Sequence, residues 1–163
     1  AGLHCGAISA SGRLDKRHPL VEAEAGPGRL VLSAEYGICL SQKDIRQVQL
    51  SKGAILSGVL TLLRHAGLEE TQIDRVLVAG QFGRHLTPES LTGSGLIPLG
   101  LRDKIRYIGN ASQMGAIACL HSREKRRQAE EIAGEMDYIE LSALEGYETA
   151  FARAMTFREC ALP

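Results

Sequence analysis

The chain has 163 residues, its 19 Lys and Arg balance 19 Asp and Glu, and 44% of its residues are hydrophobic. This length is sufficient for one domain with a substantial core. The absence of net charge argues against a nucleic-acid surface or a polybasic membrane patch. Only 4% of the residues are aromatic, which argues against base stacking on single strands. No apolar run approaches the roughly 20 residues that a membrane helix needs.

The cysteines are scattered, without a C-x-x-C pair and without a histidine at zinc-ligand spacing: Cys5, Cys39, Cys119 and Cys160. Zinc sites and iron–sulfur clusters need grouped ligands, so we expect no metal site in these residues. Free thiols are typical of a reducing cytoplasm. The first residues contain neither an initiator Met nor a signal-peptide pattern. We therefore expect a cytoplasmic fragment of a longer polypeptide.

The first part of the chain differs in character from the rest. Residues 1–28 are interrupted by Gly and Pro, which predicts a loosely organised segment with a short helix over residues 3–8. Residues 29–163 are expected to form the main domain. A strand over residues 29–37, ending at a turn, begins it.

The clearest predicted element is a helix over residues 41–66. Ser41 and Asp44 have capping-box spacing, and Gly67 is placed for a left-handed end. Its apolar positions recur every three or four residues: Ile45, Val48, Ile55, Val59, Leu62 and Ala66. Lys52 falls within this stripe. Either its stem lies along the apolar surface with the ammonium in water, or the ammonium lines a ligand cleft together with Gln49, three residues earlier.

Two units further along share one pattern of strand, glycine turn and capped helix. In the first, the strand 76–79 leads into the turn Gly80–Gly83, and Thr87 and Pro88 begin a helix. In the second, the strand 105–108 meets Gly109, and Asn110 caps a helix. If the strands are parallel, both turns lie at the carboxyl edge of one sheet, where nucleotides bind. Ordinary turn formation is the alternative explanation, since neither turn has a Rossmann or P-loop spacing.

The remaining sequence predicts a charged helix over residues 122–131, a strand over 136–141 and a closing helix over 145–155. Within the charged helix, Arg126–Glu130 and Arg127–Glu131 have the spacing of ion pairs. The alternation of strands and helices predicts a three-layer α/β fold with a mixed sheet. The histidines are dispersed, and no hydrolase motif or magnesium and phosphate loop is present. No residue is therefore assigned to catalysis.

Three blocks occur in a characteristic order: QKDIRQVQLSKGAI (42–55), VLVAGQFGRHLTPES (76–90) and IRYIGNASQMGA (105–116). They resemble the C-terminal domain of the reductive activators of corrinoid enzymes, over roughly residues 36–157. Those activators combine an N-terminal 2Fe–2S ferredoxin domain with a C-terminal domain of the acetate kinase/sugar kinase/Hsp70/actin superfamily. They use ATP to drive electrons onto cob(II)alamin and restore cob(I)alamin. The resemblance thus implies a partial actin-like, ribonuclease H-like fold.

The resemblance also implies roles for individual residues. VAGQFG corresponds to the adenosine motif, which brings Gly80, Gln81 and Gly83 near the nucleoside. YIGNASQMGA corresponds to the second connecting motif, in which Gly109, Asn110 and Gly115 help two helices pack at the interdomain hinge. The helix that carries Gln49 and Lys52 flanks the adenosine pocket. The family more often has Ala or Gly where Gln81 stands, and the ferredoxin cysteines and phosphate loops are absent from this sequence.

The expected function is therefore the C-terminal module of an ATP-dependent corrinoid activator, contributing the adenosine side of a nucleotide site. The 163 residues alone are expected to bind ATP weakly or not at all and to be inactive. The expected partner is a corrinoid iron–sulfur protein or a corrinoid methyltransferase, and a homodimer is also considered. Two alternatives remain: a dimerisation or corrinoid-protein docking module with a vestigial pocket, and a fragment of a sugar- or acetate-kinase-like enzyme.

Overall fold

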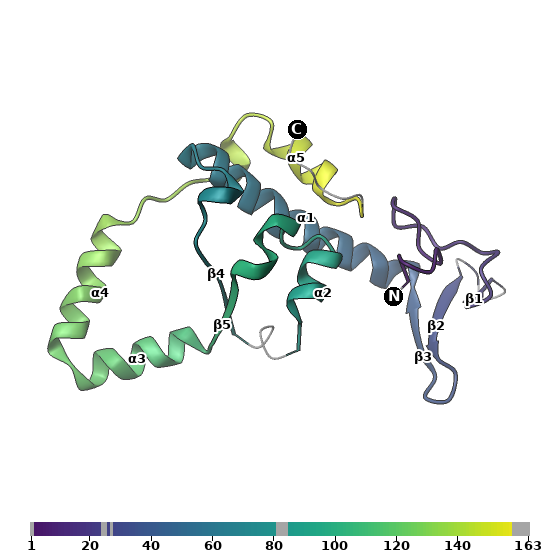
Figure 1. Ribbon diagram of the computed structural model, residues 1–163, viewed down its shortest axis with the longest axis horizontal. Coiled ribbons are helices and arrows are strands. Elements are labelled where there is room, and N and C mark those ends of the chain that lie inside the picture. Colours follow the sequence, from purple (N-terminus) through teal and green to yellow (C-terminus); the bar gives the residue numbers. More distant parts are fainter. Residues whose placement is uncertain (1, 24–25, 27, 81–84, 158–163) are drawn as a thin grey trace.

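The computed structural model describes residues 2–23, 26, 28–80 and 85–157, and Figure 1 shows their arrangement. The strands are β1 (Val21–Glu22), β2 (Arg29–Ser33), β3 (Ile38–Ser41), β4 (Val76–Ala79) and β5 (Ile105–Gly109). The helices are α1 (Gln42–Ala66), α2 (Pro88–Gly93), α3 (Ala111–His121), α4 (Arg123–Glu135) and α5 (Tyr147–Ala154). Short 3-10 helices are η1 (Glu70–Gln72), η3 (Leu99–Lys104) and η4 (Leu141–Ala143).

The long helix α1 begins and ends where the sequence predicts. The Asp44 backbone N–H donates to Ser41 Oγ (3.2 Å), and the Ser41 N–H donates to Asp44 Oδ2 (2.8 Å), which completes the capping box. Gly67 ends the helix in the left-handed conformation, with φ of 66°. Local sequence signals therefore define both ends of the longest element.

The buried face of α1 is not the predicted apolar stripe. Val48, Ile55 and Leu62 are about half exposed. The buried positions are mostly polar or small: Ile45, Gln49, Lys52, Gly53, Leu56, Ser57, Gly58 and Thr61. The reason is α5, which lies along this other face (Figure 1). A Cβ added at Gly53 would lie 2.7 Å from Met155 Cγ, so the close approach of the two helices depends on a missing side chain.

The antiparallel sheet has the strand order β1-β2-β3 and packs on the start of α1. The predicted strand over residues 29–37 ends earlier, at Ser33, and β1 and β3 were not predicted. A helix over residues 3–8 is wrong, because this segment forms turns and Ile8 bridges Leu14. Apolar residues of this segment join the sheet and α1 in one core cluster: Ala7, Ile8, Leu14, Val21, Leu30 and Ile45. The division of the chain at residue 28 stays a prediction.

The second sheet consists of β4 and β5 in parallel, with Val76 opposite Ile105 and Ala79 opposite Gly109. One face of it contacts a core cluster whose buried members are Leu91, Ile97, Leu101 and Ile105. The described strands thus form two sheets, one antiparallel and one parallel, within a mixed α/β fold. Parallel pairing was the condition for bringing the two glycine turns together, and it is met.

Helices α3 and α4 form an arm that extends from the end of β5 and returns toward α1 (Figure 1). No residue of either helix is buried. On α4, Arg127 pairs with Glu131 as predicted and also with Glu124. The predicted Arg126–Glu130 pair is not among the ion pairs of the described residues; Arg126 instead donates to the carbonyl of Cys119 (3.2 Å). We call residues 111–135 the arm.

The segment after the arm corrects another prediction. Residues 136–140 form no strand, because no described strand lies beside them to complete hydrogen bonds. They connect α4 to η4, and α5 then closes the chain close to the predicted position. In the part of the chain that the structure describes, no helix combines the length and apolarity required to cross a membrane.

Replacement of Ser41 by Ala tests the N-terminal cap of α1. Ser41→Ala removes the acceptor of the Asp44 N–H, and we expect a loss of about 1 kcal/mol in the free energy of unfolding. Urea denaturation measures this loss. Ser51→Ala, at an exposed position inside the same helix, is the matched control and should not lower the stability. Equal stability of the two variants would contradict the capping role.

The same cap should depend on pH. Hydrogen bonds from Ser41 lower the pKa of the Asp44 carboxyl. A carboxyl with a lowered pKa in the folded state stabilises the fold above its ordinary pKa and loses that contribution as the pH falls through the lowered value. The stability difference between the wild-type chain and Ser41→Ala should therefore shrink at acidic pH. A constant difference between pH 7 and pH 2 would refute the assignment.

Candidate adenosine-side site

The two glycine turns lie side by side at the carboxyl ends of β4 and β5. The Gly80 N–H donates to the Gly109 carbonyl at 2.7 Å. Gly80 has φ of 80° and Gly109 has φ of 66°, a region that favours glycine. Among the described residues, no atom apart from those of the adjoining residues lies within 4 Å of a Cβ built at either position, so the main chain is open on this side. We call Gly80, Gly109 and Asn110 the glycine rim.

Asn110 completes the glycine rim by capping α3. Its Oδ1 accepts from the Gln113 N–H at 3.1 Å, and its Nδ2 donates to Gln113 Oε1 at 3.3 Å. The first turn of a helix directs backbone N–H groups outward, which suits a polar or anionic group. The N-terminus of α3 therefore lies at the same edge of the β4–β5 sheet as the exposed main chain of Gly80 and Gly109.

A tyrosine that the sequence did not indicate connects the two units. The Tyr107 hydroxyl donates to the Leu86 carbonyl, which joins β5 to the segment just before α2. Its position two residues before Gly109 is the only sequence signal that could have suggested a role at the rim. On α2 itself, the Glu89 carboxylate pairs with Arg102 at 2.5 Å, and this contact lowers the pKa of Glu89. The segment that contains Leu86 and Glu89 is thus held by a hydrogen bond from Tyr107 and an ion pair with Arg102.

Two of the predicted adenosine-motif residues, Gln81 and Gly83, lie outside the described residues. His85, which follows them, is exposed. The structure thus brings together Gly80, Gly109 and Asn110 from the predicted set.

Lys52 and Gln49 occupy a different environment, between α1 and α5. The Lys52 side chain is 0% exposed, and its Nζ donates to the carbonyls of Ala154 (2.5 Å) and Thr156 (2.8 Å). Gln49 Nε2 donates to the carbonyls of Met155 and Ser11, both at 3.1 Å. The interpretation that Lys52 extends its ammonium into water is therefore wrong. Lys52, which interrupts the apolar periodicity of the helix, therefore makes polar contacts in the core.

The electrostatics of this contact are favourable. The carbonyls at the end of a helix lack intrahelical partners and carry partial negative charge, so a buried cation is best placed there. Ala154 is the last residue of α5, and Met155 and Thr156 follow it. The surrounding space is full: a Cβ at Gly95 would lie 2.6 Å from Lys52 Cε, and one at Gly12 would lie 2.4 Å from Gln49 Cδ. Two loop glycines therefore give room to these two side chains.

Metal binding finds no support in the described part of the chain. No group of three or more His, Cys, Asp or Glu side chains is placed to hold an ion there. Cys5, Cys39 and Cys119 are free thiols.

Comparisons with known proteins establish the family of this chain. Residues 1–162 match the family described as the C-terminal domain of RACo, the ASKHA domain. The chain therefore belongs to this family, whose actin-like ASKHA fold it shares.

Two individual relatives are similar to the chain. A corrinoid activation enzyme, RamQ of Eubacterium limosum, is 32% identical over 105 residues, which are 64% of this chain and 18% of RamQ. A solved structure, a reductive activator for a corrinoid, iron–sulfur protein, is 30% identical, with a TM-score of 0.83 over 95% of this chain and 26% of the other. The chain thus spans about a fifth to a quarter of the length of these relatives.

Replacement of Lys52 tests the contact between α1 and α5. Lys52→Met keeps most of the side-chain volume but leaves the two carbonyls without this donor, so we expect a loss of about 1–3 kcal/mol in stability. Urea denaturation followed by circular dichroism measures it. Lys43→Met, on the exposed face of the same helix, should stay within about 0.5 kcal/mol of the wild type. A Lys52→Met chain as stable as Lys43→Met would show that the hydrogen bonds contribute nothing.

Proposed function

We propose that this chain forms the adenosine side of an ATP site in a longer, ATP-dependent reductive activator of corrinoid proteins. One observation carries the proposal: the Gly80 turn, which the family resemblance assigns to adenosine binding, and the Gly109 turn are hydrogen-bonded neighbours with open main chain. The family membership and the names of both relatives support the same activity.

The rim residues would act mainly by leaving the main chain accessible to a ligand. Glycine lacks a Cβ, so a flat adenosine group can approach the main chain at Gly80 and Gly109. Asn110 fixes the first turn of α3 beside them. Gln81 and Gly83 would complete the same turn. Gln49 and Lys52 would support the site from α1 by fixing that helix to α5, rather than by offering an exposed ammonium to the ligand.

In the whole activator, ATP would supply the free energy for an uphill electron transfer. The electron would pass from an iron–sulfur domain outside this chain to cob(II)alamin, giving cob(I)alamin on a corrinoid iron–sulfur protein or corrinoid methyltransferase. Nucleotide binding can shift an equilibrium between two conformations of the activator only if the nucleotide binds one conformation more tightly than the other. A rim that begins α3 is suited to such a role, because a ligand on it would contact the first helix of the arm.

Gly109→Asn in the full-length polypeptide tests the nucleotide site. Asn tolerates a positive φ, so the turn should form, but its side chain would occupy the open space above the rim. We expect ATP to bind at least about tenfold more weakly, as measured by calorimetry. Gly37→Asn is the matched control, since Gly37 also has a positive φ (62°) and open surroundings, in the β2–β3 turn.

Unchanged ATP affinity in a folded Gly109→Asn protein would remove the rim from the site. If corrinoid reduction also continued unchanged, the alternative of a docking module with a vestigial pocket would be favoured. The 163-residue chain alone should bind ATP weakly or undetectably, because the phosphate loops are absent from it.

A further inference from the structure

Two residues on either side of the first glycine turn, Gly80 and Leu86, are both attached to β5. The Gly80 N–H donates to the Gly109 carbonyl at 2.7 Å. The Leu86 carbonyl accepts a hydrogen bond from the Tyr107 hydroxyl. Gly109 and Tyr107 belong to the same strand, with one residue between them. One strand therefore sets the positions of both attachment points.

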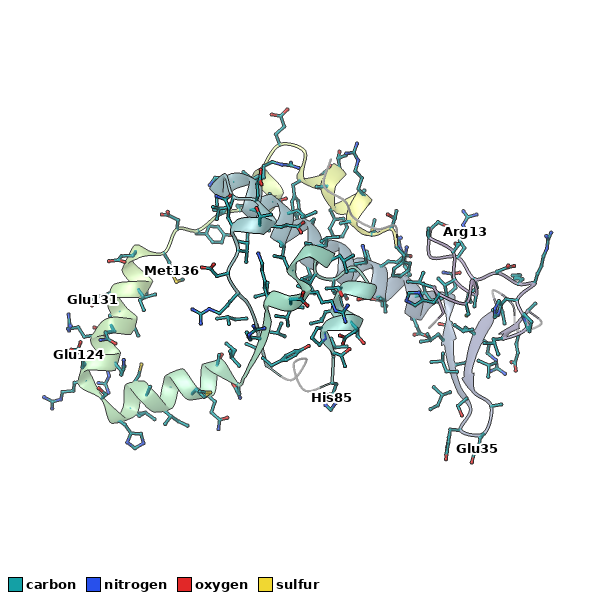
Figure 2. All side chains as sticks on the ribbon, in the orientation of Figure 1. Arg13, Glu35, His85, Glu124, Glu131 and Met136 are labelled. Atoms are coloured by element: carbon teal, nitrogen blue, oxygen red, sulfur yellow. The ribbon has the colours of Figure 1, made fainter. Side chains whose placement is uncertain are left out.

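Tyr107 faces the core cluster against which Leu86 packs. Tyr107 is opposite Val78 in the parallel pairing, and it shares a face of β5 with Ile105, two residues earlier. Ile105 is a buried member of that cluster, and Val78 and Leu86 pack against it. Figure 2 shows His85, the residue before Leu86, pointing away from β5 into solvent. Leu86 thus contacts the core through its side chain and Tyr107 through its carbonyl.

The chain beyond Leu86 is fixed by contacts of its own. The Thr87 Oγ1 accepts from the Ser90 N–H at 3.2 Å, and the Thr87 carbonyl accepts from the Leu91 N–H at 3.0 Å. Leu91 is buried in the same core cluster. These contacts begin α2 without Tyr107, so the tyrosine hydroxyl adds a constraint at Leu86 in particular.

The hydrogen bond from Tyr107 is better suited to positioning than to stability. Tyr107 is 38% exposed, so water competes with the Leu86 carbonyl for its hydroxyl. A hydrogen bond that exchanges with water contributes little net stability. It still favours one position of Leu86 relative to β5. A binding site that is held in one arrangement before the ligand arrives loses less conformational freedom on binding, which raises the affinity.

We propose that Tyr107 is a positioning residue for adenosine: its hydroxyl holds Leu86 in place relative to β5, so that Gly80 and Gly109 stay accessible to the nucleoside. The role rests on the proposed function, because it belongs to the same nucleotide site. The phosphate loops are absent from this sequence. The effect of Tyr107 therefore concerns the nucleoside half of the ligand and is the same for ATP, ADP and AMP.

Tyr107→Phe in the full-length polypeptide tests this role, because it removes only the hydroxyl. We expect ATP, ADP and AMP each to bind about three- to tenfold more weakly, as measured by calorimetry, with AMP in competition with ATP. The urea midpoint of unfolding should stay close to that of the wild type. Tyr138→Phe is the matched control. The Tyr138 hydroxyl donates to Glu140 in the connector after α4, away from the glycine rim (Figure 1), and its loss should leave the three affinities unchanged.

Four results would overturn the role of Tyr107. Unchanged affinities in Tyr107→Phe, together with weaker ATP binding in Gly109→Asn, would keep the nucleotide site and remove Tyr107 from it. Weaker binding of ATP with unchanged binding of AMP would assign the hydroxyl to the phosphate side. A lower urea midpoint together with weaker binding would make the hydrogen bond a structural contact. Unchanged affinities in both variants would remove the proposed function as well.

Discussion

The contact between α1 and α5 joins the beginning, middle and end of this chain. Lys52 and Gln49 donate hydrogen bonds to carbonyls at the end of α5, and Gln49 also donates one to the carbonyl of Ser11. A buried ammonium is tolerated only where hydrogen bonds replace water, and the carbonyls at a helix end supply them. Gly53 lets the helices approach closely enough for these bonds to form. The polar positions of α1 therefore face inward, and its apolar stripe is left at the surface.

That reversal has a consequence for the rest of the fold. Within the described residues, apolar side chains are exposed on α1 (Val48, Ile55 and Leu62), on the β4–β5 sheet (Leu77 and Ile108) and on α3 (Met114, Ile117 and Leu120). An apolar surface of this extent is uncommon on a complete globular protein. The matched region makes up 18% of RamQ and 26% of the solved reductive activator.

The glycine rim was largely predictable, because its determinants are local. A strand, a glycine and a capping residue are readable from neighbouring positions, so the starts of β4, α2, β5 and α3 follow from the sequence. The Ser41 cap and the Gly67 end of α1 are local in the same sense. Failures occurred where a partner distant in the sequence decides. Residues 136–140 have strand-forming composition but no described neighbour to pair with, and β1 is too short to show a period.

The sequence by itself determined most of the element types from α1 to α4, the two glycine turns and the family, because each depends on residues close together in the chain. It also marked Lys52 as exceptional. Only the tertiary structure decided what Lys52 does, since its partners lie 102 and 104 residues away. The tertiary structure likewise decided which face of α1 is buried. Periodicity shows that a helix has an apolar side. Which side of α1 becomes buried depends on which other part of the fold packs against it closely, and here that part is α5.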